Sequence, residues 1–161
     1  MKSIFQTIML LLGISVNIFA QSGPAQTIPQ FTFFKTDKAP FTDKDLAQDK
    51  KIFFIFYDSD CEHCRHAIQF INSHIEAFSK ATVCILTVDS KEKIEPFMDK
   101  YGIQLLGKKN VTILQDLNNE FIIKFKPRKY PSLFLYSANK QLMMYDDDEK
   151  KLPKFLKLLK K

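Results

Sequence analysis

The chain has 161 residues, of which 45% are hydrophobic and 26% are charged. This composition is typical of a globular protein, and the length allows one well-packed domain but not two of ordinary size. The formal net charge is +6, and much of the excess comes from lysines in the last twelve residues. Because the aromatic residues fall in apolar strand-like runs rather than on a basic surface, no nucleic-acid partner is expected.

The first twenty residues differ from the rest of the chain. Lys2 is followed by an apolar run over residues 4–19, and Ala20 ends this run just before a polar stretch. The pattern predicts a signal peptide over residues 1–20 that is cleaved near Ala20, with an uncleaved membrane anchor or a buried helix as alternatives. We therefore expect export, then a flexible lead-in over residues 21–30 and one folded domain over residues 31–161.

Strand-like and helix-like runs alternate along the domain. Strands are expected at residues 31–35, 51–58, 83–89 and 111–116, and the last two strands, 131–136 and 142–146, form a hairpin. Short helices are expected around residues 42–47 and over 117–126. Longer helices are expected to begin at Cys64 and in the lysine-rich C-terminal segment. A further helix is expected to begin at a capping box formed by Asp89 and Glu92 and to end at Gly102. This order predicts an α/β domain with a mixed central β-sheet flanked by helices on both faces and closed by the hairpin and the last helix.

The C-terminal segment alternates lysines with apolar residues at helical spacing. We interpret it as a helix with a solvated lysine face over a docked apolar stripe, rather than as a membrane-surface helix.

Two cysteines, Cys61 and Cys64, stand where the strand over 51–58 gives way to a helix. The unpaired amides and the positive end of the dipole at a helix N-terminus favour a thiolate, so Cys61 is expected to be the nucleophile. Cys64 lies one helical turn later, where it could attack a mixed disulfide and release the product. His63 is expected to tune this couple, whereas nearby acidic residues oppose a second negative charge.

Other uses of these cysteines are open at this point. A metal could be held by Cys61, Cys64, His63 or His66, although a zinc site needs about four ligands and the chain has only one Cys-x-x-Cys pair. A purely structural disulfide is a further alternative, but closing so short a loop gains little stability. Covalent haem attachment is excluded because Arg65 stands where that motif needs histidine. Cys84 lies in an apolar strand run and is expected to be an inert core thiol.

The run KIFFIFYDSDCEHC, the amphipathic helix after it, the strands VCILTVD and VTILQD, and Tyr130-Pro131-Ser132 at the start of PSLFLY together resemble the thioredoxin superfamily. The resemblance covers about residues 30 to 160 and is greater to the exported bacterial TlpA/ResA-like thiol-disulfide oxidoreductases. It implies a thioredoxin-like fold, a cis-proline loop at Pro131 that faces the cysteines and binds substrate with its neighbours, and a location in the bacterial periplasm.

Several positions depart from the superfamily pattern. Asp60 stands where tryptophan is usual before the first cysteine, and Glu62 and His63 stand between the cysteines in place of glycine and proline. The two positions at which related proteins carry a proton-transferring acid are Ile55 and Ala67. The spacer instead resembles that of oxidases and isomerases such as DsbA and protein disulfide isomerase. Asp58 and His66 are therefore the candidates for proton transfer.

These observations predict an exported thiol-disulfide oxidoreductase, with Cys61, Cys64 and His63 in the catalytic site and Tyr130, Pro131 and Ser132 in the substrate groove. No dissociable cofactor and no resident metal are expected, since the Cys61-Cys64 disulfide carries the electrons. The expected partners are exported protein thiols or disulfides and a thiol protein in the membrane that donates or accepts electrons. A reductase is favoured; an oxidase or isomerase, or a non-enzymatic metal- or haem-delivery module, are the alternatives.

Overall fold

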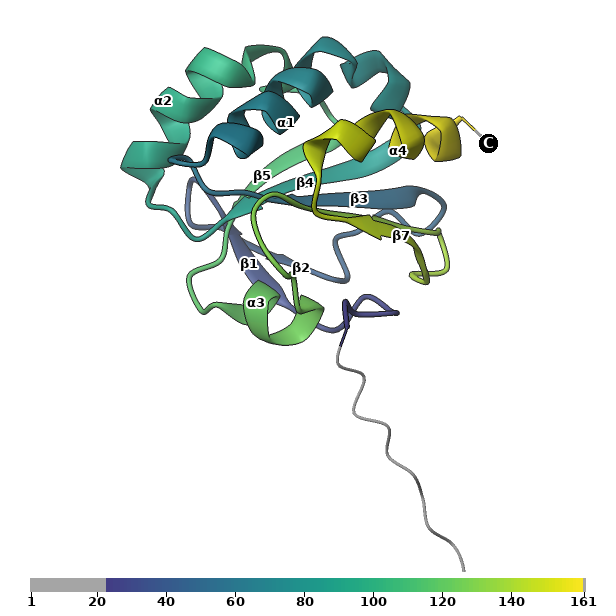
Figure 1. Ribbon diagram of the computed structural model, residues 1–161. Coiled ribbons are helices and arrows are strands. Elements are labelled where there is room, and N and C mark those ends of the chain that lie inside the picture. The colour runs from purple at the N-terminus through teal and green to yellow at the C-terminus, as the bar shows by residue number, and fades with distance from the viewer. Residues whose placement is uncertain (1–22, 161) are drawn as a thin grey trace, which may run out of the picture.

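The computed structural model describes residues 23–160, which form a mixed seven-stranded sheet with helices on both faces (Figure 1). The strand order is β2-β1-β5-β4-β3-β6-β7. The strands are β1 (Thr32–Lys35), β2 (Pro40–Thr42), β3 (Lys51–Phe56), β4 (Ala81–Thr87), β5 (Val111–Gln115), β6 (Ser132–Tyr136) and β7 (Leu142–Asp146). The central strands β3, β4 and β5 are parallel, and β1 and β6 flank them in the antiparallel sense. The predicted α/β fold class is thereby confirmed.

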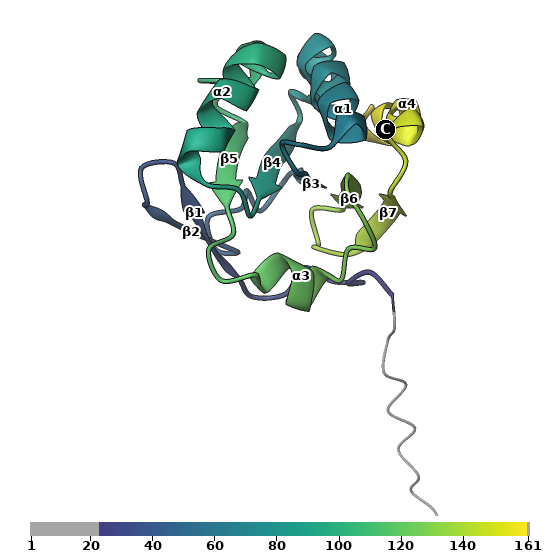
Figure 2. The same ribbon diagram turned by 60° about the vertical axis from the view of Figure 1, so that its left-hand side comes forward.

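Helices cover the two faces of the sheet unequally. The α-helices are α1 (Glu62–Ser73), α2 (Lys91–Tyr101), α3 (Glu120–Phe125) and α4 (Leu152–Leu159), and the 3-10 helices are η1 (Ile75–Phe78), η2 (Ile103–Leu105) and η3 (Glu149–Lys151). Figures 1 and 2 show α1, α2 and α4 on one face and the short α3 alone on the other. The predicted signal peptide over residues 1–20 lies outside the described residues. Among the described residues, no helix is long and apolar enough to cross a membrane.

Strand β3 is buried on both faces and divides the core in two. Phe53, Ile55 and the following Tyr57 pack beneath α1, α2 and α4. Phe54 and Phe56 point to the opposite side, where they join an aromatic cluster with α3. Because successive side chains of a strand point to opposite faces, a continuous apolar run is what such a central strand requires.

The burial of residues in the C-terminal helix agrees with the interpretation made from its sequence. Leu152, Phe155 and Leu159 of α4 are buried, while Lys154 and Lys157 are exposed. The apolar stripe of this helix is thus covered by the core of the domain.

The structure corrects two local predictions. Residues 43–49 form turns and bends rather than a helix, and the short strand β2 precedes them. The N-cap of α2 is Ser90 and not Asp89, whose carboxylate accepts hydrogen bonds from the Ser59 amide and the Thr87 hydroxyl instead. The position of Asp89 in the sequence had suggested a cap, but the contact with Ser59 joins segments thirty residues apart and has no local sequence signal.

The described part of the expected lead-in is bonded to the domain. The Ile28 amide donates to the Lys140 carbonyl at 3.0 Å, and the Leu142 amide donates to the Gln26 carbonyl at 2.8 Å. This differs from the flexible segment expected from its composition, because the backbone of residues 26–28 pairs with the edge of β7.

Replacing Phe54 by alanine should lower the free energy of unfolding by about 3–5 kcal/mol, since the ring is fully buried among Phe121, Phe125 and other rings and would leave a cavity. Ile123→Ala is the matched control, because Ile123 is 67% exposed and its loss should change stability by less than about 0.5 kcal/mol. Urea denaturation of both variants measures the difference, and equal effects would contradict the placement of β3 at the centre of the core.

Candidate active site

The two cysteines lie at the N-terminus of α1, directly beyond the end of β3. Cys61 is the N-cap residue of α1, and its Sγ accepts a hydrogen bond from the Cys64 amide at 3.4 Å. The Cys61 amide donates to the Asp58 carbonyl at 3.2 Å, which closes the turn before the helix. The sulfur of Cys61 therefore faces a hydrogen-bond donor and the positive end of the helix dipole.

The loop that presents Cys61 is fixed from a neighbouring strand. The Ser59 amide donates to Asp89 Oδ2 at 2.9 Å, which ties the loop to the turn after β4. Lys93 Nζ lies 2.7 Å from Asp60 Oδ2 and pairs the loop with α2. These contacts come from residues that are about thirty positions away in sequence, so the position of Cys61 is set by the fold and not by its own segment alone.

The two thiols have different surroundings. Cys61 is partly exposed, whereas Cys64 is fully buried, and both are free. Burial raises the pKa of Cys64, and the negative charges of Cys61 and Asp58 add to this shift. Cys64 is thus kept protonated in the resting site, and Cys61 is the sulfur that a macromolecular partner can reach.

His63 points away from the core and meets a residue from the far end of the chain. Its side chain is 66% exposed, and its Nδ1 lies 3.0 Å from Oε1 of Glu149, whose side chain is only 13% exposed. Glu149 belongs to η3, 86 residues later, so no local pattern could have predicted this pairing.

The proline loop lies beside the end of β3. The Tyr130-Pro131 peptide bond is cis, and Ser132 pairs with Phe56 in the antiparallel register of β3 and β6. The ring centroids of Tyr130 and Phe56 are 4.8 Å apart, and Tyr130 lines the same surface hollow as His63. The resemblance implied a cis proline at this position, and the structure brings its neighbour Tyr130 together with His63.

The side chain of Ser132, which was predicted to contact substrate, does not lie on the surface of the protein. Its side chain is fully buried, and its hydroxyl lies 2.7 Å from the Lys129 carbonyl, to which it donates, and 3.0 Å from the Tyr145 hydroxyl. Ser132 therefore holds the proline loop in shape and does not itself face the groove.

Of the two proton-transfer candidates, Asp58 lies nearer to the buried thiol. Its Oδ1 accepts the Asp60 amide at 2.7 Å, and its charge is among those that raise the pKa of Cys64. His66 is exposed and its ring nitrogens gather with His63 and Glu149 instead. The positions of Ile55 and Ala67 are buried and apolar. The proton-transfer roles of Asp58 and His66 stay predictions.

Sequence analysis gave no role to Tyr57, whose hydroxyl is fully buried and has no hydrogen-bond partner within residues 23–160. Burial raises its pKa, and the charges of Asp89 and Cys64 contribute to this shift. Its ring stacks on Phe97 with centroids 4.9 Å apart. Because Tyr57 continues the apolar run of β3, its sequence signal is that of an ordinary core residue.

A sheet of this topology, with a Cys-x-x-Cys at the helix that follows its central strand and a cis-proline loop beside it, defines a thioredoxin-like protein of the thiol oxidoreductase class. The chain belongs to the AhpC/TSA family, which it matches over residues 24–145. The predicted enzyme class, a thiol-disulfide oxidoreductase, is confirmed by this membership together with the fold. No curated protein matches the chain.

Solved structures share the fold at low sequence identity. A secreted disulfide oxidoreductase from Mycobacterium tuberculosis, described as homologous to E. coli DsbE, has a TM-score of 0.66 at 18% identity, over 80% of this chain and 96% of its own. A thiol-disulfide oxidoreductase from Bacteroides fragilis has a TM-score of 0.66 at 16% identity, over 83% and 98%. The peroxidoxin BcpB from Mycobacterium tuberculosis has a TM-score of 0.70 at 13% identity, over 86% and 96%. These likenesses support the fold.

In the native reduced protein at about pH 8, iodoacetamide should modify Cys61 and leave Cys64 and Cys84 unmodified, because the latter two sulfurs are fully buried and their pKa values are raised by burial. All three should react in concentrated urea. Peptide mass spectrometry reads the sites directly, and modification of Cys64 as fast as Cys61 would contradict the asymmetry.

The unfolding free energy of the reduced protein should fall as the pH rises above about 8.5, the ordinary thiol pKa. Burial raises the pKa of Cys84 in the folded state, so the unfolded chain loses this proton first and the stability present at lower pH is lost. Cys84→Ala should make the slope shallower by up to about 1.4 kcal/mol per pH unit. Urea denaturation between about pH 7.5 and about pH 10 checks this, with Ile123→Ala retaining the wild-type slope; an unaltered slope in Cys84→Ala would overturn it.

Proposed function

We propose that the protein is an exported thiol-disulfide oxidoreductase of the TlpA/ResA-like kind, which reduces disulfides of other exported proteins through Cys61 and Cys64. The observation that carries this proposal is the pairing of a partly exposed sulfur at the N-cap of α1 with a buried thiol one helical turn later. Thiol-disulfide exchange needs one accessible attacking sulfur and a second sulfur shielded until the mixed disulfide exists.

The exchange has two steps. The Cys61 thiolate attacks one sulfur of the substrate disulfide, which breaks that bond, forms a mixed disulfide and releases the other substrate sulfur as a thiolate. Cys64 then loses its proton to Asp58 or water and attacks the sulfur of Cys61. The products are a Cys61-Cys64 disulfide and a fully reduced substrate, so two electrons have passed to the substrate. A thiol protein of the membrane returns these electrons by the same exchange in reverse.

The groove beside the site suits an extended polypeptide. Tyr130 lies between two surface hollows, one shared with His63 and the other lined by Phe56, Ile122 and Pro127. The substrate chain would contact the backbone at Pro131, with an apolar side chain in the second hollow. Such a site would favour an exposed disulfide that lies next to an apolar residue of the substrate.

Export is proposed from the apolar run that ends at Ala20. The periplasm fits this chemistry, because disulfides in partner proteins form and persist in oxidising compartments. A cleaved leader and an uncleaved anchor would both place the domain there, and N-terminal sequencing of the expressed protein separates them.

The direction of electron flow follows from the redox potential of the couple. His63 between the cysteines favours the reduced form, which would make the protein an oxidase or isomerase, whereas the acidic residues around the loop oppose a thiolate and favour a reductase. A potential near about −270 mV would support the reductase, and one near about −120 mV would support the oxidase. A metal- or haem-delivery module without exchange activity would show neither reductase nor oxidase turnover.

Peroxide reduction is a second candidate, favoured by the membership of the AhpC/TSA family. The Cys61 thiolate would attack one oxygen of hydrogen peroxide, which breaks the O–O bond, releases hydroxide and leaves Cys61 as a sulfenic acid. The Cys64 thiol would then attack the Cys61 sulfur, release water and close the Cys61-Cys64 disulfide. Hydrogen peroxide consumption by the reduced protein, measured beside reduction of a protein disulfide, distinguishes the two activities.

A Cys64→Ser variant should accumulate mixed disulfides with exported proteins, because the first exchange can occur and the second cannot. Cys61→Ser should give none, and Cys84→Ala should behave as wild type because this thiol is sealed in the core. Non-reducing gels and mass spectrometry of trapped adducts provide the readout. If Cys64→Ser traps no partner through Cys61, protein disulfide exchange is not its function.

A further inference from the structure

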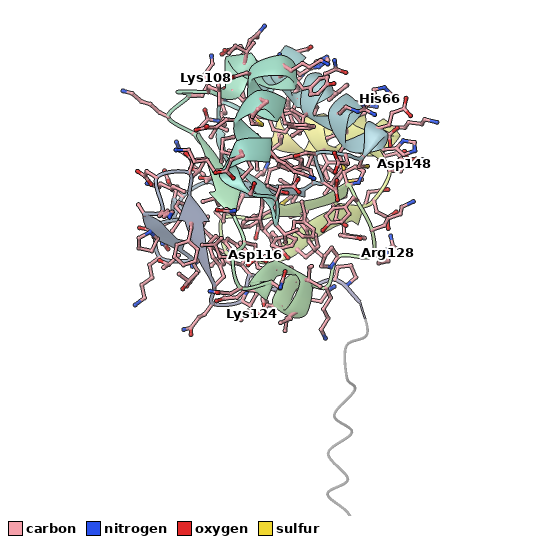
Figure 3. All side chains as sticks on the ribbon, turned by 90° about the vertical axis from the view of Figure 1, so that its left-hand side faces the viewer. His66, Lys108, Asp116, Lys124, Arg128 and Asp148 are labelled. Carbon is pink, nitrogen blue, oxygen red and sulfur yellow. The ribbon has the colours of Figure 1, made fainter. Side chains whose placement is uncertain are left out.

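A cluster of metal-ligating side chains stands on the outer surface of α1, separate from the two cysteines. His63 and His66 lie one helical turn apart on α1, and Glu149 reaches them from η3. One ring nitrogen of each histidine and a carboxylate oxygen of Glu149 lie within 4.8 Å of one another. Figure 3 shows His66 on the same side of the molecule as Asp148, which directly precedes Glu149 in the sequence. From this geometry we propose that His63, His66 and Glu149 form a binding site for Zn²⁺ or a similar divalent transition metal.

The donor set suits such an ion. Two imidazole nitrogens and one carboxylate oxygen are ligands that zinc accepts in three-residue protein sites, with a fourth position left to water. Hard cations such as Mg²⁺ and Ca²⁺ prefer oxygen ligands, so the histidines select against them. The proposal therefore concerns late transition metals and leaves the thiols free.

The distances need little rearrangement. Ligand atoms about 2.0–2.1 Å from a tetrahedral ion are about 3.3 Å from one another. The pair of His63 and Glu149 is already at 3.0 Å. The remaining adjustment falls on His66, whose side chain is exposed and has no hydrogen bond or ion pair among residues 23–160, so a rotation of its ring breaks neither.

The hollow around the site is lined by charges of both signs. Asp147 and Asp148 line it with His63 and Glu149, and their negative charges favour a dication, although Arg128 Nε lies 2.8 Å from Asp147 Oδ2 and Lys151 Nζ lies 3.8 Å from Asp148 Oδ2. Lys129 and Lys150 also line it and oppose the ion, although Lys129 is 3.7 Å from Asp147 Oδ1 and is paired with it. The Glu149 side chain is only 13% exposed, and its Oε1 already lies 3.0 Å from His63 Nδ1, so these two ligands are close together before the ion arrives.

A bound ion would join two parts of the chain at the edge of the redox site. It would connect the first turn of α1 to η3, which are already in contact through His63 and Glu149. Because His63 also lines the hollow beside Tyr130, the ion would occupy the rim of the groove. Occupancy would thus raise thermal stability and restrict the motion of His63, one of the two residues between the cysteines.

The test uses the full chain with Cys61→Ser and Cys64→Ser, which removes the accessible thiols as ligands. Calorimetric titration with ZnCl₂ should show one ion bound per chain and a rise in melting temperature. Adding His66→Ala, or Glu149→Gln, should weaken zinc binding at least tenfold. His74→Ala is the matched control, because His74 lies at the other end of α1, where its Nδ1 is 2.8 Å from the Phe70 carbonyl, and its loss should leave the affinity unchanged.

Histidine ring resonances provide a second readout that does not depend on stability. Zinc should shift the ring signals of His63 and His66 and leave those of His74 in place. Absence of zinc binding in the Cys61→Ser/Cys64→Ser protein, or equal zinc affinity with and without the added His66→Ala substitution, would overturn the proposal. Binding that requires the cysteines would overturn it as well, while leaving the exchange function of Cys61 and Cys64 to be judged by its own adduct experiment.

Discussion

The pairing of β3 with β6 is the constraint on which the rest of the site depends. The register that sets Phe56 opposite Ser132 brings the exit of β3 and the entry to β6 to the same end of the sheet. The chain that leaves β3 leads to Cys61, and the chain that enters β6 comes from Pro131. A shift of one residue would turn every side chain of β6 to the opposite face, and the aromatic cluster around Phe54 would no longer be filled. Packing of the core and alignment of the site are therefore one requirement.

The chemistry of the site rests on a difference between two identical side chains. Cys61 and Cys64 lie within one helical turn, yet only Cys64 is sealed beneath α1, where burial favours its neutral form. Helix α1 causes this difference, because its free N-terminal amides face Cys61 and because Cys64 lies on its buried, apolar side. Under the proposed exchange mechanism, this difference would make Cys61 attack first and Cys64 second.

Much of this arrangement could be read from the sequence, because it depends on local pattern. The unbroken apolar run of β3 and the change to helical spacing after Cys64 predicted the central strand and the loop that carries Cys61. The second loop of the site, at Pro131, was implied by the resemblance to the thioredoxin superfamily and not by local pattern. What escaped prediction depends on contacts between distant segments. Glu149 reaches His63 across 86 residues, and Asp89 holds the Ser59 amide rather than capping α2. The sequence predicted Ser132 as a residue of the substrate groove, but its hydroxyl donates a hydrogen bond to the Lys129 carbonyl within the proline loop.

The pairing of residues 26–28 with the hairpin also affects whether the edge of this sheet can associate with the sheet of another molecule. An uncovered outer strand is a template for joining sheets of separate molecules. Here the Thr27 bridge to Gln141 covers the start of β7, and at the opposite border β2 is only three residues long and begins with Pro40. Both borders of the sheet are therefore poor starting points for β-strand addition between molecules.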